Sequence, residues 1–416
     1  MISPPTSIFK VNTFRLIFFI AGLSNFLRIK INVEIIPIEI LCVFFGVFSL
    51  LSPNTGSFES SDSKILKFLN LFLVVSLITQ LSVDSIYEVN STETIKSCAQ
   101  ILVIWALLRI AVIYMQPDFV RFVFYVSGYL LSLSIQYLVS PSIYAQTDPW
   151  KFAFGPTITG LYFLLLKSRL PFLGNVTFLI LLVSVDVLLG SRSLALFTIL
   201  AFSLTLPARR IRQNSVTKIF LVSISIVALI FGIERTYYHL STTGTLGQAQ
   251  QLKSIDQYKA GPILFTGRSE IAFELAAIKS NPFIGSGSNP DLTLNVLNDT
   301  QQINQFFGVQ TEATNAYKTA LTNGKIPHHS VIFGAWIEGG VLIVSFWLVI
   351  LIWVLRKFGQ ISKTSHPLGN YSAYIGIATI WALFFSPLGA GSRMEIAIGL
   401  ATLLLQSNFG ENAYKN

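Results

Sequence analysis

Apolar blocks roughly 20 residues long recur along most of this chain, and no other feature constrains its fold as strongly. A helix of that length can cross the hydrocarbon core of a lipid bilayer. The 416 residues are 52% hydrophobic and 12% charged, whereas a soluble domain carries about 25% charged residues. The sequence therefore predicts an all-α, polytopic integral membrane protein.

The pattern of blocks predicts about twelve transmembrane helices in two groups. About nine lie within residues 1–235 and about three within residues 328–416, and residues 236–327 form one long polar segment between them. The expected spans are residues 12–28, 33–51, 65–83, 95–115, 118–140, 153–168, 171–189, 192–207, 218–235, 328–355, 370–387 and 391–407.

The positions of Lys and Arg predict the orientation, because these residues collect in short cytoplasmic loops. Three short loops carry such groups, and all three lie on the cytoplasmic side if the N-terminus does: Lys167 with Arg169; Arg209 with Arg210, Arg212 and Lys218; Arg356 with Lys357 and Lys363. The net charge of +9 is thus explained by membrane orientation rather than by nucleic-acid binding. The segment 236–327 is expected to be an extracytoplasmic domain.

Within that segment, residues 266–280 read as an amphipathic helix. We expect Thr266 to cap its N-terminus and the apolar face made by Ile271, Leu275 and Ile278 to lie against the membrane side of the protein. The helix should stop at Asn281, because the residue before a proline is biased away from helical geometry. Gly285 and Gly287 then allow a tight turn.

Arg192 lies at the joint between two predicted spans, with Ser191 and Ser193 on either side and Asp186 shortly before. One interpretation is a snorkelling anchor, whose stem lies in lipid while the guanidinium reaches water. The polar neighbours favour the other interpretation, because ionisable groups in a membrane usually face the protein interior and mark a functional path.

Arg268 is expected to open the amphipathic helix. A surface arginine paired with Glu270 or Glu274 is the simpler interpretation. A cation near a helix N-terminus opposes the helix dipole, however, unless an anion binds there as well. An anion shared by Arg192 and Arg268 would resolve the conflict. Diphosphate fits best, because guanidinium groups bind phosphate oxygens as a planar fork.

His328 and His329, half of the four histidines, directly precede the apolar run that opens the last three spans. Capping or packing at the helix end is one interpretation. A metal pair is not expected, because adjacent helical residues diverge and no nearby Cys, Asp or His completes a ligand set. The alternative is that a neutral histidine at the membrane boundary removes a proton from a hydroxyl group near neutral pH.

Three stretches together resemble the O-antigen polymerase and O-antigen ligase superfamily, which are integral membrane glycosyltransferases of the GT-C type. They are SRSLAL from Ser191, GRSEIAFELAAIKSNPFIGSG from Gly267, and HHSVIFGAWIEGGVLI from His328. The family pattern has a His-Asn pair nine residues ahead of a Glu-x-Gly. His329, Glu338 and Gly340 match that spacing, and Ser330 replaces the Asn. The resemblance covers about residues 185–345.

The resemblance implies transfer of glycan units from an undecaprenyl-diphosphate carrier to an acceptor sugar at the outer face of the bacterial inner membrane. Arg192 and Arg268 would bind the diphosphate, His328 would contribute to substrate binding, and His329 would act as general base. Neither a metal nor a cofactor is expected, since the arginines would take the metal's place. The implied partners are the lipid-linked oligosaccharide, an acceptor glycan, membrane lipids and proteins of a polysaccharide export system, with no nucleic acid.

Several alternatives stay open. The motifs do not separate a polymerase of O-antigen or exopolysaccharide from an O-antigen ligase. A multi-pass transporter, such as a flippase of lipid-linked glycan or a carrier of a small anion, would be expected to show repeated halves with interrupted helices. No matching halves are evident, and the polar residues cluster at one membrane face. A non-catalytic scaffold would have no need of the Arg and His set.

Overall fold

The protein is almost entirely helical. The computed structural model describes residues 13–30, 34–51, 60–115, 119–141, 143–205, 232, 235–245, 247–262, 266–361 and 368–412. Within these residues the only sheet is a two-residue antiparallel ribbon of β1 (Ile29–Lys30) and β2 (Glu34–Ile35). The prediction of an all-α protein is confirmed for this part of the chain.

The helices before the long polar segment follow the predicted apolar blocks closely. They are α1 (Thr13–Leu23), the 3₁₀ turn η2 (Ser24–Phe26), α2 (Pro37–Leu51), α3 (Ser60–Ile86), α4 (Ser91–Ile110), α5 (Phe119–Val139), α6 (Ile143–Thr147), α7 (Gly155–Leu161), α8 (Phe172–Leu188) and α9 (Arg192–Leu204). Three π-helical turns extend this set: η4 (Ala111–Met115), η5 (Trp150–Phe154) and η6 (Tyr162–Leu166).

The remaining helices belong to the long polar segment and to the C-terminal group. They are α11 (Gln248–Ala260), α13 (Glu270–Ser280), α14 (Leu294–Phe306), the 3₁₀ turn η8 (Thr311–Ala313), α15 (Asn315–Asn323), α16 (Val331–Ile361), α17 (Gly369–Phe385) and α18 (Ala390–Asn412). The expected ninth span, residues 218–235, lies almost wholly outside the described residues.

Three described helices are long and apolar enough to cross a membrane: Lys67–Ile86 of α3, Val120–Val139 of α5 and Val331–Phe358 of α16. Four shorter apolar helical stretches accompany them: Thr13–Phe26, Pro37–Leu50, Phe172–Leu188 and Arg192–Leu204. These apolar helices indicate that the protein is associated with a membrane. The count of about twelve spans stays a prediction.

The long helices form one bundle with a continuous apolar core. α1 packs against α5, α2 against α4, α8 against α9, and α17 against both α16 and α18. Trp105, Trp347 and Tyr371 are among the largest side chains in its core. An ion pair is also buried there, since both Arg393 and Glu39 are almost fully enclosed and bond each other through two nitrogens. This pair links α18 to α2, which lie at opposite ends of the sequence.

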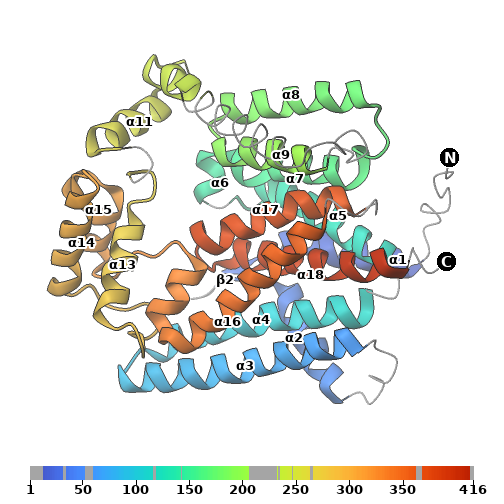
Figure 1. Cartoon of the computed structure of the whole chain (residues 1–416), viewed down its shortest axis with the longest axis horizontal. Coiled ribbons are helices and arrows are strands. Elements are labelled where there is room, and N and C mark those ends of the chain that lie inside the picture. The colour runs from blue at the N-terminus through green and yellow to red at the C-terminus, as the bar shows by residue number, and fades with distance from the viewer. Residues whose placement is uncertain are drawn as a thin grey trace, which may run out of the picture.

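The helices α11, α13, α14 and α15 of the long segment lie together at one end of this bundle (Figure 1). They carry a second, smaller apolar core in which Phe273, Ala276 and Ala277 of α13 meet Val296 of α14 and Ile337 of α16. Because Ile337 belongs to both the small core and α16, the segment is packed onto the bundle. The exact bounds of this segment, residues 236 and 327, stay a prediction.

The structure corrects two predictions for α13. Thr266 does not cap the helix, because its hydroxyl bonds the Pro262 carbonyl and α13 begins only at Glu270. The predicted apolar face was right for Ile278, which is buried, but wrong for Leu275, which is exposed; Phe273, Ala276 and Ala277 make up the rest of the buried face. Small alanines allow α14 and α16 to approach closely, so close packing rather than hydrophobicity selects the buried face. The predicted end at Asn281 is confirmed.

The turn after α13 is fastened to a break in α16. Gly340 lies within α16 with a non-helical backbone (φ 67°, ψ −159°). The amide that follows it, on Val341, donates to the Phe283 carbonyl at 3.1 Å, and the amide of Gly287 donates to the Glu338 carbonyl at 3.0 Å. The expected tight turn is confirmed, since Gly285 and Gly287 both have positive φ.

We expect Gly340→Ala to destabilise the fold by roughly 2–4 kcal/mol, because two costs combine. A Cβ at Gly340 would lie only 2.2 Å from the Phe283 carbonyl oxygen, and the φ of 67° disfavours any L side chain. Thermal unfolding of the purified protein measures the effect. Gly389→Ala is the matched control, because no atom lies within 4 Å of its added Cβ and its φ is ordinary. Equal melting temperatures for the two variants would contradict this role of the break.

Candidate functional site

Arg192 is the first residue of α9, at the tight joint that follows α8. Gly190 in this joint has a positive φ, and the Ser191 amide donates to the Asp186 carbonyl at 2.7 Å. The Arg192 guanidinium carbon lies 4.2 Å from the ring centroid of Tyr237, which is 4% exposed. Within the described part of the chain this guanidinium has no hydrogen bond and no ion pair. Arg192 is thus held by an aromatic face with its N–H groups unused.

Arg268 was predicted to lie in the first turn of the helix. It lies instead in the turn before α13. Its Nη1 donates to the Phe385 carbonyl at 3.2 Å. Its guanidinium carbon lies 5.4 Å from the ring centroids of both Trp381 and Phe385, at the end of α17. Cation–π contacts of this kind can hold a guanidinium without neutralising its charge.

The structure brings the two arginines into one electrostatic neighbourhood. Burial lowers the pKa of Arg268; nearby Arg192 lowers it too, while Glu270 and Glu274 act in the opposite direction. The guanidinium remains charged, because the ordinary pKa of arginine lies far above neutrality. Two like charges held close together repel each other, and a bound anion would remove that repulsion. The shared cavity predicted for them stays a prediction.

His329 lies beside Arg268, and its backbone is firmly positioned. The amides of His329 and Ser330 both donate to Glu274 Oε1, at 2.7 and 3.0 Å. Glu274 is buried, and burial raises its pKa to about 7 against these hydrogen bonds. The Ser330 hydroxyl in turn accepts from the Phe333 amide and donates to the Leu383 carbonyl. Ser330 therefore caps α16 and ties it to α17.

The ring of His329 has one enclosed and one accessible side. Its Nδ1 is buried without a hydrogen-bond partner among the described residues, 3.8 Å from Glu270 Oε1, yet the whole side chain is 44% exposed. Burial lowers the pKa of His329, and His328 and Arg268 lower it further, whereas Glu270 raises it. At neutral pH the ring is therefore neutral and its Nε2 can accept a proton.

His328 faces a different carboxylate. Its Nε2 lies 3.5 Å from Glu338 Oε1, its Nδ1 contacts the Ile326 carbonyl at 3.2 Å, and its side chain is 23% exposed. Ser97 of α4 donates to the other oxygen of Glu338 at 3.3 Å. Glu338 is thus the carboxylate beside His328, whereas Glu270 is the one beside His329. The two adjacent histidines diverge, as their neighbouring positions predict.

In this region Arg268 therefore interacts electrostatically with both Arg192 and His329, whereas the Nε2 of His328 lies against Glu338. Sequence reasoning missed the groups that hold this region together: Tyr237, Trp381 and Phe385 behind the arginines, and Glu274 behind the histidine. Trp381 and Phe385 are four residues apart on α17, which is the spacing of one helix face. That spacing alone does not distinguish an arginine support from ordinary packing.

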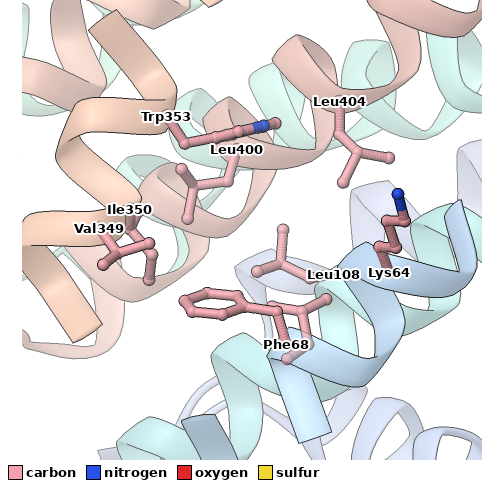
Figure 2. A pocket seen from close by; sticks show the side chains of 9 residues that line it. Lys64, Phe68, Leu108, Val349, Ile350, Trp353, Leu400 and Leu404 are labelled. Carbon is pink, nitrogen blue, oxygen red and sulfur yellow. The ribbon is translucent and has the colours of Figure 1, made fainter. Parts of the chain in front are cut away.

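A separate hollow of about 210 Å³ lies between α3, α4, α16 and α18 (Figure 2). Apart from Lys64 its lining is apolar, with Phe68, Trp353 and Leu404 among the wall residues. Asp84 of α3 contacts Ser288 of the long segment. Lys64 is twenty residues before Asp84, so the hollow lies about 30 Å along α3 from that contact. The hollow offers no acid, base or nucleophile other than Lys64 and is not a candidate for the chemistry.

No protein-family model matches this chain, and no curated protein matches it. The features that bear on function are therefore the geometry around Arg192, Arg268 and His329 and the three motifs that contain these residues.

Proposed function

We propose that the protein is a membrane glycosyltransferase that transfers or polymerises glycan units from an undecaprenyl-diphosphate carrier at the outer face of the bacterial inner membrane. The observation that carries this proposal is the pair of neighbouring guanidiniums, Arg192 and Arg268, each supported by aromatic rings and neither in a close ion pair among the described residues. Such a pair suits a ligand with more than one negative charge.

A diphosphate is the leaving group that these cations would stabilise. When the bond between the anomeric carbon and the diphosphate breaks, negative charge grows on the phosphate oxygens. Preorganised cations at that position lower the barrier, because they need no reorganisation as the charge develops. The aromatic face behind Arg192 leaves the edge of its guanidinium free for forked bonds to those oxygens, and Arg268 keeps its remaining N–H groups beyond the one bond from Nη1 to the Phe385 carbonyl.

His329 is the proposed general base. Its Nε2 takes the proton of an acceptor hydroxyl while the oxygen attacks the anomeric carbon, forming the glycosidic bond as polyprenyl diphosphate leaves. Glu270 lies too far from Nδ1 for a hydrogen bond in this structure, at 3.8 Å, but close enough to stabilise the imidazolium that forms. A small movement of either side chain would complete the bond.

The test is reconstitution of the purified protein in vesicles with a polyprenyl-diphosphate-linked oligosaccharide. We expect a new glycosidic bond and an equal amount of released polyprenyl diphosphate. Lengthening of the lipid-linked glycan itself would identify a polymerase, and transfer to a different acceptor would identify a ligase. Movement of the glycan across the bilayer with no diphosphate released would contradict the proposal and support a flippase.

The rate of transfer should depend on pH through His329. Because burial lowers the pKa of this histidine, the neutral base should persist through neutrality, and activity should fall only below the usual histidine range. Glu270→Gln removes the influence that raises this pKa, so the acid limb should move to lower pH. The measurement is the pH profile of the transfer rate for both proteins. A shift to higher pH in the variant would contradict this reading of the site.

A further inference from the structure

A second pocket, of about 310 Å³, lies where the turn between α3 and α4 meets the C-terminal end of α13. Its walls come from three stretches that are far apart in the sequence: residues 87–93, residues 277–296 and the Lys325–Ile326 pair. Hydroxyl, amide and carboxylate groups recur along the lining, and the exposed side chain of Tyr87 belongs to it as well. A concave site with many hydrogen-bonding groups and an aromatic ring suits a polyhydroxylated ligand.

The backbone of this pocket is held in an uncommon conformation on two of its walls. Glu88 and Asn289 are the two non-glycine residues with positive φ among the described residues, both at 51°, and both line the pocket. Asn tolerates this region, but Glu does so only at a cost, and such residues concentrate at ligand-binding sites. The wall around Asn289 is anchored from behind, because Ser288 donates to Asp84 through both its amide and its hydroxyl.

The charge of the pocket excludes the diphosphate itself. Its carboxylates are Glu88, Glu93 and Asp291, and its one cation, Lys325, is already paired with Asp291 at 2.7 Å. Glu93 is paired with Lys96 at 2.7 Å, whereas Glu88 is exposed and has no side-chain partner among the described residues. An anionic ligand would meet uncompensated negative charge here, while sugar hydroxyls would find an acceptor.

The pocket lies at the C-terminal end of α13, away from Arg268 and from the ring of His329. Ala277 and Ser280, on its wall, belong to this end, and α13 spans about 15 Å. The ring of His329 lies against Glu270, the first residue of α13, although Ile326 on the pocket wall is only three residues before His329. A glycan that presents a hydroxyl to His329 would therefore extend about 15 Å along α13 to reach this pocket.

We infer that this pocket binds the acceptor glycan, as an uncharged or amino-bearing oligosaccharide segment that lies about 15 Å along α13 from the sugar that is glycosylated. The inference builds on the proposed function and gives it a recognition site. The carboxylate of Glu88 accepts hydrogen bonds from sugar hydroxyls, and Tyr87 packs against a sugar ring.

The test measures binding of free oligosaccharide to the full-length protein in detergent, by calorimetry. The probe is the oligosaccharide that mild acid releases from the lipid-linked glycan of the cell carrying this protein. We expect wild-type protein to bind it, and both Glu88→Gln and Glu88→Gly to bind it roughly tenfold more weakly, as loss of a charged hydrogen-bond acceptor implies. Glu88→Gly also relieves the positive φ, so its melting temperature should not fall.

Two controls separate this inference from the proposed function. Glu312→Gln, which alters an exposed carboxylate of the long polar segment outside the pocket, should bind like wild type. Arg192→Lys should also bind the free glycan normally, because the probe lacks the diphosphate. Unchanged binding in both Glu88 variants, or no binding by wild-type protein that performs transfer, would overturn the inference. Glycan binding without transfer in the vesicle assay would instead leave the pocket standing and contradict the proposed function.

Discussion

Arg192→Lys and Arg268→Lys should each lower the rate of glycan transfer by about 10²–10³-fold, the effect of removing one preorganised donor from a developing oxyanion. Lysine keeps the charge but not the planar fork, so it binds two phosphate oxygens poorly. It also loses much of the stacking on Tyr237 for Arg192, and on Trp381 and Phe385 for Arg268. The measurement is the initial rate of polyprenyl diphosphate release in vesicles.

Two comparisons make this result specific. Arg356→Lys changes an exposed arginine near the other end of α16 and should leave the rate unchanged. The double variant Arg192→Lys with Arg268→Lys should be only slightly slower than either single variant if both groups hold one anion, because residues that act as a unit are strongly non-additive. Fully multiplicative losses would argue for two separate sites, and normal rates in either single variant would contradict the diphosphate clamp.

His329→Ala should slow transfer by about 10²–10⁴-fold, the usual contribution of a general base. His328→Ala should cost less than about tenfold, because its ring faces Glu338 and not the arginines. Binding of the lipid-linked donor should survive in both variants, since the arginines remain. The measurement is single-turnover transfer with donor binding followed in parallel.

The two histidine variants also identify errors in the assignment. Full activity in His329→Ala at normal expression would end the proposal of a histidine base at this position. Full activity there together with a large loss in His328→Ala would move the base to His328, with Glu338 as its partner. Loss of donor binding in His329→Ala would mean that the histidine acts in binding rather than in proton transfer.

Much of the fold follows from local features of the sequence. The apolar blocks predicted α3, α5 and α16, and the Asn281–Pro282 pair predicted the end of α13. Such features can be predicted because helix length and helix ends depend on residues that are neighbours along the chain. The joint before Arg192 and the turn at Gly285 and Gly287 could be predicted for the same reason.

Side-chain contacts between segments that are distant in the sequence could not be predicted in this way. The spacing of Glu338 from His329 matched a sequence motif but did not say which carboxylate each histidine meets, and the structure pairs Glu338 with His328 and places Glu270 beside His329. The choice depends on which way each ring turns as the chain enters α16, and Glu274 sets that path by binding two consecutive amides. Spacing along the sequence cannot report a bond made from another helix.

The sequence by itself determined that the described part of this chain is helical, where its long apolar helices lie, and which residue types were available for an anion site and a base. Only the tertiary structure decided that Glu338 pairs with His328, that α13 buries Phe273 rather than Leu275, and that a pocket forms beside Ile326. The physical reason is that helices arise from contacts within a few residues, whereas these sites are made where α9, α13, α16 and α17 pack against one another, and close packing depends on side-chain shape across segments that no local pattern relates.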